Sequence, residues 1–392
     1  MNSLPFSQVA KRLAVAEDDV WAIHYEAADR LKAGEDIILM SVGDPDFPTP
    51  DDISTQLVSS IKRGRTHYSP PNGELELRSA IAELECQATG KVFSADHFVI
   101  FPGATGALYA TLSTLCDPGD EIVIPEPMYI GYRGYIKALG IEVKSPHLNL
   151  DEDCALDVDE LLAYVGPKTK AVLVNTPGNP LGNIIPAEQL ASLAEALAER
   201  NVWLISDEVY SLLTFEEPHV SLLKCAKDLS NVIVIDGLSK SHAMTGWRIG
   251  WVAGPLELTQ ALTNYSSAAL FGCSQFIQDA AAYALKTNGP YVDHMCELYR
   301  QRRDFFAERV KRIPNLDCLM PKAGMFMMLD FRRISNDVPG LVRQLLDVEG
   351  VSFVPGEGFG PTAASFARAS LTHDLDTLNE VGDRLERFLA AY

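Results

Sequence analysis

The sequence lacks several features that define whole classes of protein. Its seven cysteines are an odd number without a C-x-x-C pair, which fits neither a disulfide framework nor a zinc site. No apolar run approaches the roughly 20 residues that cross a bilayer. The N-terminal segment has no apolar stretch of the kind found in signal peptides. We therefore expect a soluble, cytoplasmic protein without a metal site or a membrane partner.

Basic residues are scarce relative to acidic ones. The chain has 33 Lys plus Arg against 53 Asp plus Glu, a net charge of −20. This balance argues against a nucleic-acid partner, because affinity for phosphate backbones comes from Lys and Arg. The 47% hydrophobic and 22% charged residues are ordinary for a globular protein. At 392 residues the chain can form two domains, or a large domain with a smaller one.

Short apolar runs bounded by turn residues recur from about Phe98 onward: HFVIF, EIVIP, IEVKS, KAVLVN, VWLISDE, NVIVID and RIGWVAG. Segments with helical periodicity separate most of them. Runs without strict apolar and polar alternation, separated by helices, predict an α/β fold with a mainly parallel sheet covered on both faces.

The two ends of the chain have a different pattern. We expect an amphipathic helix over 6–35 and a short strand over 37–42. After about residue 290 the pattern predicts a long charged helix, a few strands and a final helix. We predict a large domain over 50–289 and a smaller α+β domain formed by 1–49 and 290–392.

Ligands in open parallel sheets bind beyond the carboxyl ends of the strands, so the residues that follow each run are informative. Pro102–Gly106 follows the first run and opens a helix, a place where an anion such as phosphate can bind. Asn179 lies in the rigid turn NTPGNPLG, and Asp207 ends a buried strand. Each of these three features by itself also fits a purely structural role, as an ordinary turn or as part of an ion pair.

The segment GLSKSHAMTGWRIG places Lys240 and Arg248 among small and polar residues. A lone lysine is usually a solvated surface residue. A lysine near an anion site and a strand-end Asp instead indicates an amine with a lowered pKa that forms a Schiff base. Pyridoxal phosphate needs a lysine for its aldehyde, a carboxylate for its ring nitrogen and an anion site for its phosphate. The combination predicts this cofactor.

The sequence resembles the class I/II aminotransferases of the fold-type I pyridoxal-phosphate family from about Ile37 to the C-terminus. The resemblance rests on eight segments in the family's order: SVGDPDFPTP, YSPPNGELELRSAIA, GATGAL, PEPMY, NTPGNPLG, SDEVYS, LSKSHAMTGWRIGW and FARASL. Within the family, WAIHYEA, LSKSHAMTGWRIGWVAGP and FIQDAA resemble the arginine–pyruvate transaminase type. The resemblance implies a large domain with a mostly parallel seven-stranded sheet, a smaller α+β domain, pyridoxal 5'-phosphate and a homodimer.

The resemblance also implies roles around the cofactor ring. Lys240 would hold the cofactor covalently and act as the general base. Asp207 would keep the ring nitrogen protonated, which makes the ring an electron sink. Tyr210 and Asn179 would hydrogen-bond the phenolic oxygen, and Tyr129 would stack on the ring.

Other implied roles concern the phosphate and the substrate. The phosphate would be held by residues of two segments: Gly103, Ala104, Thr105, Ser239 and Arg248. Tyr68 would reach the phosphate from a neighbouring subunit. Arg368 would bind the substrate α-carboxylate as a two-pronged donor, helped by Gly43 and Asn179. By itself Arg368 also fits a surface strand residue.

The sequence departs from the family pattern at a few positions. Gly237 replaces a common Ser, so one hydroxyl for the phosphate is missing and cofactor affinity is expected to be lower. Leu181 replaces a Thr, with a slight effect on its turn, and Tyr129 replaces the Trp of aspartate-type relatives. Residues 265–275, where some aspartate-type enzymes supply an Arg for a second carboxylate, contain no basic residue.

We therefore expect reversible transfer of an amino group from an L-amino acid to a 2-oxo acid, in two half-reactions. The expected donor is arginine or another long basic amino acid, with pyruvate as acceptor. Asp18, Asp19 and Glu26 are nearby acids that could meet a guanidinium, although acids are common in this chain.

Three alternatives remain open. The first is an aspartate-type or broad-specificity aminotransferase. The second is a lyase or decarboxylase of the same fold, which would have identical phosphate and lysine motifs. The third is a non-catalytic regulator that senses the cofactor. Such regulators carry an added basic DNA-binding region, and none precedes the fold in this sequence.

Overall fold

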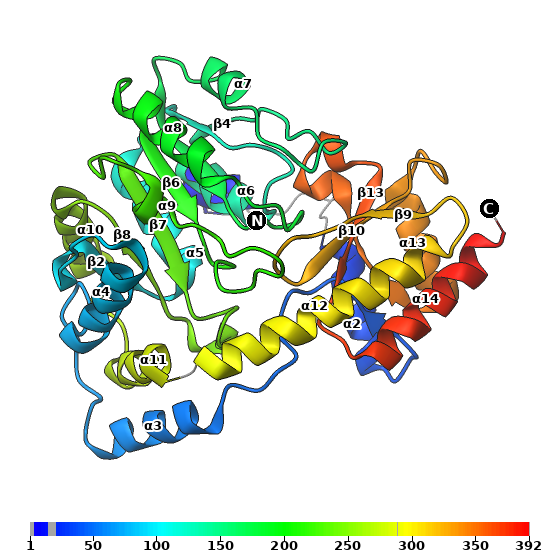
Figure 1. Ribbon diagram of the computed structural model, residues 1–392, viewed down its shortest axis with the longest axis horizontal. Coiled ribbons are helices and arrows are strands. Elements are labelled where there is room, and N and C mark those ends of the chain that lie inside the picture. The colour runs from blue at the N-terminus through cyan, green and yellow to red at the C-terminus, as the bar shows by residue number, and fades with distance from the viewer. Residues whose placement is uncertain (1–3, 15–20, 288, 392) are drawn as a thin grey trace.

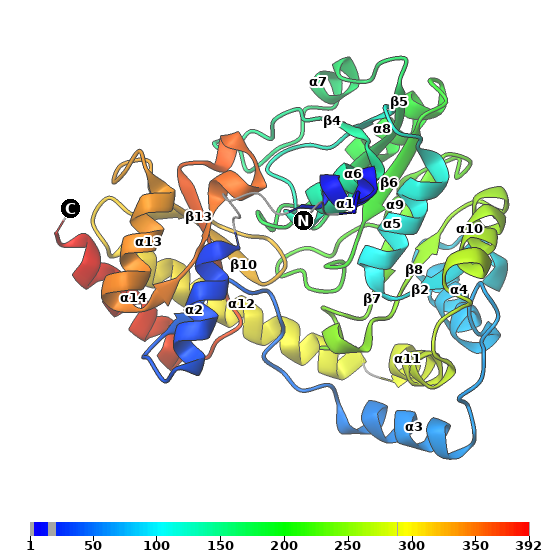
Figure 2. The same ribbon diagram turned by 180° about the vertical axis from the view of Figure 1, so that it is seen from behind.

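The computed structural model describes residues 4–14, 21–287 and 289–391. A large sheet with helices on both faces forms one side of the molecule (Figure 1). A smaller sheet with its own helices forms the other side. The long helix α12 (Gly289–Lys311) runs from the large sheet's side to the smaller sheet, and Figure 2 shows the same arrangement from behind.

The large sheet has seven strands and is mainly parallel, as predicted. Their spatial order is β2 (Phe98–Phe101), β8 (Gly250–Ala253), β7 (Val232–Gly237), β6 (Trp203–Asp207), β5 (Thr169–Asn175), β3 (Glu121–Val123) and β4 (Glu142–Lys144). Each of the seven apolar runs forms one of these strands. The exception to the parallel arrangement is β8, which is antiparallel to both β2 and β7.

Helices cover both faces of the large sheet. Successive residues of β5 show this, because Leu173 packs into one hydrophobic cluster while Val172 and Val174 pack into another. One face carries α5 (Gly103–Leu115), α6 (Gly131–Leu139) and α10 (Leu256–Ala269). The other face carries α4 (Leu75–Thr89), α8 (Ala187–Ala198), α9 (Leu222–Cys225), α11 (Gln275–Thr287), α3 (Asp51–Lys62) and α7 (Val158–Ala163). Burial on both faces explains why these strands are continuously apolar.

The smaller sheet is antiparallel, in the order β12 (Val354–Pro355), β13 (Phe366–Ser370), β10 (Phe326–Asp330) and β9 (Asp317–Leu319). Its core lies against α12, α13 (Val338–Glu349) and α14 (Leu375–Leu389). The N-terminal segment joins this part, because β1 (Ile38–Leu39) pairs in parallel with β11 (Val351–Ser352). The proposed domain division at residues 50 and 290 stays a prediction.

The N-terminal segment differs from the single helix expected over 6–35. The described residues form two helices there, α1 (Gln8–Arg12) and α2 (Ala22–Lys32). Helix α1 has no buried residue, whereas α2 packs Ala27 against Ile37 and Leu346. The apolar residues of this stretch therefore do not share one buried face. Among the described residues, no helix has both the length and the apolar character needed to span a membrane.

Candidate active site

A cavity of about 320 Å³ lies beyond the carboxyl ends of β5, β6 and β7, between the two sheets. It is lined by Trp21, Val42, Gly43, Ala104, Thr105, Leu108, Tyr129, Asn175, Asn179, Asp207, Val209, Tyr210, Ser239, Lys240, Thr245, Arg248, Phe326 and Arg368. All residues that the resemblance assigns to the cofactor or to the α-carboxylate are in this set except Gly103 and Tyr68. Segments from more than 300 residues of chain thus meet at one place.

Lys240 follows strand β7 and reaches across the cavity. Its Nζ donates a hydrogen bond of 2.6 Å to the carbonyl oxygen of Gly43. Burial lowers the pKa of Lys240 to about 8; nearby Asp44 opposes this shift, whereas Arg368 adds to it. About a tenth of the amine is therefore neutral at pH 7, against less than a thousandth for an ordinary lysine, and the neutral form is the one that can act as a nucleophile or a base.

Asp207 ends β6 and is buried. Its Oδ2 accepts a hydrogen bond of 2.6 Å from the hydroxyl of Tyr132. Burial raises the pKa of Asp207 to about 6, and the Tyr132 hydrogen bond opposes this rise. A cation placed against this carboxyl group would favour its ionised form.

Two residues near Asp207 were missed in the sequence. Asn175 ends β5 and its Nδ2 donates to the Asp207 backbone oxygen at 2.9 Å, while its Oδ1 accepts from the Asn179 amide at 2.7 Å. The strand-end rule that identified Asp207 could have identified Asn175. Tyr132 carries no such signal, because its contact depends on how α6 packs over the sheet.

An anion site lies at the N-terminus of α5. Ala104 and Thr105 line the cavity there together with Arg248, and they lie in the first turn of α5, where backbone amides have no partner within the helix. Gly103 has φ +79°, and a Cβ atom there would lie 2.6 Å from the Arg248 Nη2. Gly103 therefore contributes by leaving room for the guanidinium, although it does not line the cavity. Amide donors and a guanidinium together fit a phosphate group.

Gly237, which replaces a common Ser, lies in a tight strand pair. It is opposite Gly250 in the β7–β8 ladder. A Cβ atom at Gly237 would lie 2.8 Å from the carbonyl oxygen of Ile249, so a side chain here requires β8 to shift. The close approach of the two strands favours glycine at this position of this chain.

Arg368 lies on β13 and is only 2% exposed. Its Nη1 donates to Asn179 Oδ1 at 3.0 Å and its Nη2 to the Ser41 carbonyl at 2.8 Å. Its guanidinium lies 4.0 Å from the ring centroid of Phe326. Within the described part of the chain, Arg368 Nε has no hydrogen-bond partner. A buried guanidinium with an unused donor at a cavity wall fits a ligand carboxylate.

Aromatic side chains and one amide complete the wall. Burial raises the pKa of Tyr210, and a hydrogen bond with Asn179 opposes the rise. The Tyr129 ring packs edge-on against Tyr132, with 5.3 Å between ring centroids. Ser239 precedes Lys240 on the same wall.

Tyr68 does not line the cavity of its own chain. Its side chain is highly exposed, 83%, and its ring lies 5.3 Å from that of Phe271, which is also exposed. Tyr68 is therefore placed to contact something outside this chain.

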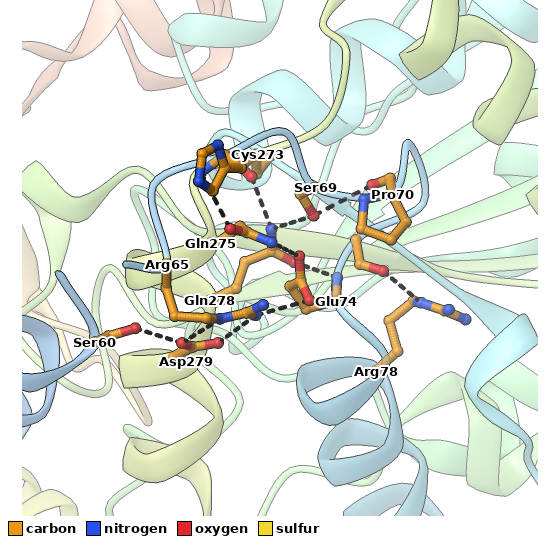
Figure 3. Close-up of polar contacts among 12 residues, drawn as sticks. Ser60, Arg65, Ser69, Pro70, Glu74, Arg78, Cys273, Gln275, Gln278 and Asp279 are labelled. Carbon is orange, nitrogen blue, oxygen red and sulfur yellow. Dashed lines mark hydrogen bonds and ion pairs between the residues drawn. The ribbon is translucent and has the colours of Figure 1, made fainter. Parts of the chain in front are cut away.

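Polar contacts with α11 hold the segment that carries Tyr68 (Figure 3). Arg65 binds Asp279 with two hydrogen bonds of 2.9 Å and Glu74 with one of 2.8 Å. On the other side of Tyr68, Gln278 donates to Ser69 Oγ at 3.0 Å and accepts from the Glu74 amide at 2.7 Å. The segment is thus fixed at both ends while Tyr68 projects from it.

Three acids, Asp18, Asp19 and Glu26, were suggested from the sequence as partners for a substrate guanidinium. Asp18 and Asp19 lie outside the described residues. Glu26 is ion-paired with Arg343 and does not line the cavity. Asp44 is close to the cavity, since its Oδ1 accepts a 2.7 Å hydrogen bond from the lining residue Thr245.

The chain is similar to known proteins in both sequence and structure. Residues 35–385 match the sequence profile of the family described as aminotransferase class I and II. The chain is 39% identical to arginine–pyruvate transaminase AruH of Pseudomonas aeruginosa, with 97% of each chain covered. It is 32% identical to an aspartate aminotransferase of Geobacillus stearothermophilus, over 98% of this chain and 99% of the other.

The structure of Thermus thermophilus aspartate aminotransferase with maleate superposes with a TM-score of 0.92 at 29% identity. The superposition covers 99% of this chain and 100% of that one. The likeness extends over both sheets and the cavity between them. The chain therefore belongs to the class I and II aminotransferases and is a transaminase that depends on pyridoxal 5'-phosphate.

Proposed function

We propose that this aminotransferase takes the amino group of L-arginine, or of another L-amino acid with a long basic side chain, and gives it to a 2-oxo acid such as pyruvate. One observation carries the proposal. Among the described lining residues the strong cations are Lys240, Arg248 and Arg368. Once the first holds the cofactor, the second its phosphate and the third the α-carboxylate, no cation remains there for a second carboxylate.

Three further observations support a basic donor. Asp44 places a carboxylate beside the cavity, where a guanidinium could meet it. The chain also shares more identity with the arginine–pyruvate transaminase, 39%, than with the aspartate aminotransferase of Geobacillus stearothermophilus, 32%. Trp21 and Phe326 offer apolar surface for the hydrocarbon part of a long side chain.

In this proposal the residues around the cofactor ring have separate roles. Bound pyridoxal phosphate supplies an aldehyde for the amino group and a ring that accepts the charge developing at the substrate Cα. Lys240 Nζ is the covalent anchor and then moves the proton at Cα, a task suited to an amine with a pKa of about 8. Asp207 would pair with the ring nitrogen as a carboxylate, and the Tyr132 hydroxyl, which donates to Asp207 Oδ2, would hold it in position.

The remaining residues orient the two ligands. The α5 N-terminus, Ser239 and Arg248 hold the phosphate, while Tyr210 and Asn179 reach the phenolic oxygen. Arg368 offers its unused Nε–H to the α-carboxylate. Gly43 lies in the same wall, where its carbonyl oxygen accepts a hydrogen bond from Lys240 Nζ in the cofactor-free protein. These contacts fix the Cα–H bond near Lys240.

We also propose a homodimer in which Tyr68 enters the partner's site. Its exposure, its absence from the lining of its own cavity and its anchored segment support this assignment. Sedimentation of the cofactor-loaded protein is expected to give a dimer. A fully active monomer would rule out the crossing of Tyr68.

Product analysis tests the reaction. The loaded protein is incubated with L-arginine and pyruvate, and the products are quantified by mass spectrometry. We expect the 2-oxo acid of arginine and L-alanine in equal amounts. Ammonia and pyruvate from a β-substituted amino acid, without a new amino acid, would indicate a lyase instead. Equal turnover of L-aspartate and L-arginine would contradict the preference for a basic donor and leave a broad-specificity transaminase.

A further inference from the structure

A second cavity, of about 540 Å³, lies outside the site described above. It is bordered by α4, by the loop after β6 and by the start of α12. The two cavities are lined by neighbouring residues of the same segments. Asp207 and Lys240 line the first cavity. Glu208 and His242 line the second. A ligand in the second cavity would therefore touch the strand ends that carry the catalytic groups.

Acidic groups dominate the charge of this second cavity. Glu85, Glu208 and Asp236 line it, with Asp293 and Lys224 among its exposed residues. Glu208 is satisfied by hydrogen bonds from Ser206 Oγ at 2.8 Å and the Leu222 amide at 2.9 Å. Asp236 accepts a 2.6 Å hydrogen bond from the Gly237 amide.

Glu85 differs from these two carboxyl groups. Across the residues described, no hydrogen bond or ion pair reaches its carboxylate. Burial raises the pKa of Glu85 to about 7, and the charge of Glu208 acts in the same direction. The Glu85 carboxyl group therefore opens onto the cavity, where water or a ligand can pair with it.

His219 lies in the same wall and forms an ion pair with Glu208. Its side chain is 1% exposed, and neither ring nitrogen has a hydrogen-bond partner among the described residues. Its Nε2 lies 3.4 Å from Glu208 Oε2, an ion-pair distance without hydrogen-bond geometry. His219 thus neutralises part of the Glu208 charge, and Glu85 is left as the carboxyl group of this wall without a partner among the described residues.

The rest of the wall is largely apolar. Ile81, Leu84, Leu212 and Trp251 contribute hydrocarbon and aromatic surface. The volume lies within the usual range of small-molecule sites, and an apolar wall with a few polar groups is the composition such sites have. The chemistry required of an occupant is thus a cationic head on a short hydrocarbon chain.

We propose that this cavity is a binding site for a small organic cation, an alkylamine or alkylguanidinium, whose head pairs with Glu85. This site is separate from the amino-donor site, and the proposal does not depend on which amino donor the enzyme uses. Its occupant contacts Glu208, Asp236 and His242, which adjoin Asp207 and the Lys240 segment, so it is placed as an effector site.

Binding of a cation should release protons. The titratable groups that face the head are Glu85, Glu208, Asp236, His219 and His242, with Lys224 and Asp293 farther out. Burial raises the pKa of Asp236 and lowers that of His242 to about 4, so His242 is neutral at pH 6. At that pH Glu85 is mostly protonated, and a cation favours its ionised form.

The test is calorimetry on the cofactor-loaded dimer with butylguanidine, which has neither a primary amine nor a carboxylate. Butylurea, of the same shape but neutral, is the matched control. We expect butylguanidine to bind, with proton release at pH 6 revealed by two buffers of different ionisation enthalpy, and butylurea not to bind. Equal binding of both compounds, or displacement of butylguanidine by a substrate-like dicarboxylate or amino acid, would overturn the assignment.

Variants locate the binding. Glu85→Gln should weaken butylguanidine binding by about tenfold or more and abolish the proton release, with transamination unchanged. Glu83→Gln, at an exposed position of the same helix, is the control and should bind normally. Leu212→Trp fills the cavity from an exposed position and should also weaken binding. Unchanged affinity in both Glu85→Gln and Leu212→Trp would overturn the proposal.

Discussion

Single residues of the main cavity are held in states that folding alone does not favour. Lys240 is an amine with a lowered pKa, Asp207 a carboxyl group with a raised pKa, and Arg368 a buried guanidinium with an unused donor. Each is unfavourable in isolation, and each is resolved by a bound ligand of the opposite chemistry. The cofactor and substrate should therefore stabilise the fold as well as react in it.

Replacing Lys240 by Met should stabilise the cofactor-free protein in a pH-dependent way. Folding lowers the pKa of Lys240 from 10.5 to about 8, so the charged amine disfavours the folded state. The penalty is absent above pH 10.5, grows as the pH falls, and is complete below about pH 8. Allowing for the lost Gly43 hydrogen bond, we expect a gain of about 2 kcal/mol at pH 7 and almost none at pH 10.

Urea unfolding of both proteins at the two pH values measures this effect. The same variant should be unable to transaminate, because the anchor and base are gone. An equal gain in stability at pH 7 and pH 10 would show that the effect comes from packing and not from the amine's charge.

Tyr132→Phe should identify Tyr132 as a positioning residue. Its hydrogen bond lowers the pKa of Asp207, so its loss should move the acid limb of the kcat profile upward by about one pH unit. Activity near pH 6 should then fall about fivefold, with a smaller loss at pH 8.

Tyr135→Phe is the matched control for Tyr132→Phe. Tyr135 lies on the same helix, is also buried, and its hydroxyl has no hydrogen-bond partner among the described residues. Its removal should leave the pH profile in place. A Tyr132→Phe enzyme that is merely less stable, with an unmoved acid limb, would contradict the positioning role.

Motifs in the sequence were sufficient to select Lys240 and Asp207, because each follows or ends a strand that can be recognised, whereas Arg368 was selected through the family resemblance. Tyr132 could not be selected, because it meets Asp207 only through the packing of α6 over the sheet. Likewise the sequence placed Gly43 beside the substrate, whereas in the structure the Gly43 carbonyl accepts from Lys240 and the Ser41 carbonyl binds Arg368.

At the scale of elements, the site depends on how closely backbone segments approach one another. The turn at Gly103 brings the α5 N-terminus against Arg248, and the β7–β8 pair brings Gly237 against Ile249. Such contacts leave no room for added side chains. They are set by tertiary packing, so the sequence shows the glycines without showing what approaches them.

Gly103→Ala should weaken cofactor binding. The new methyl group would lie 2.6 Å from Arg248, and the residue would keep a φ of +79° that L side chains rarely adopt. We expect the dissociation constant for pyridoxal phosphate to rise about tenfold or more, as measured by absorbance titration. Gly134→Ala on α6, where no atom lies within 4 Å of the added Cβ, should bind the cofactor normally.

Arg65→Lys tests the anchoring of the Tyr68 segment. Lysine cannot reproduce the two hydrogen bonds to Asp279 together with the one to Glu74. We expect cofactor affinity to fall several-fold and the ratio of activities on different donors to stay the same. Lys62→Gln, near the segment and exposed, is the control. Cofactor affinity that is unchanged in Arg65→Lys would contradict a role for this segment.

At the scale of the whole molecule, the α/β class and the strands of the large sheet were predictable, because burial on both faces leaves continuous apolar runs. The strand order was not. In particular, β8 lies between β2 and β7 and is antiparallel to both. The residues that pair in β2 and β8 are more than 140 positions apart in the chain. The break between α1 and α2 and the short strand β9 were also missed, since neither has a distinct periodic pattern.

The most direct test of the account is the first half-reaction, followed as loss of the lysine-bound cofactor absorbance after mixing with one amino donor. We predict rapid loss with L-arginine, much slower loss with L-aspartate, and recovery of the original absorbance when pyruvate is added. Loss that is as fast with L-aspartate as with L-arginine would contradict the proposed specificity. Absence of any change with L-arginine, in protein that carries the cofactor on Lys240, would contradict the assignment of this cavity as an arginine transaminase site.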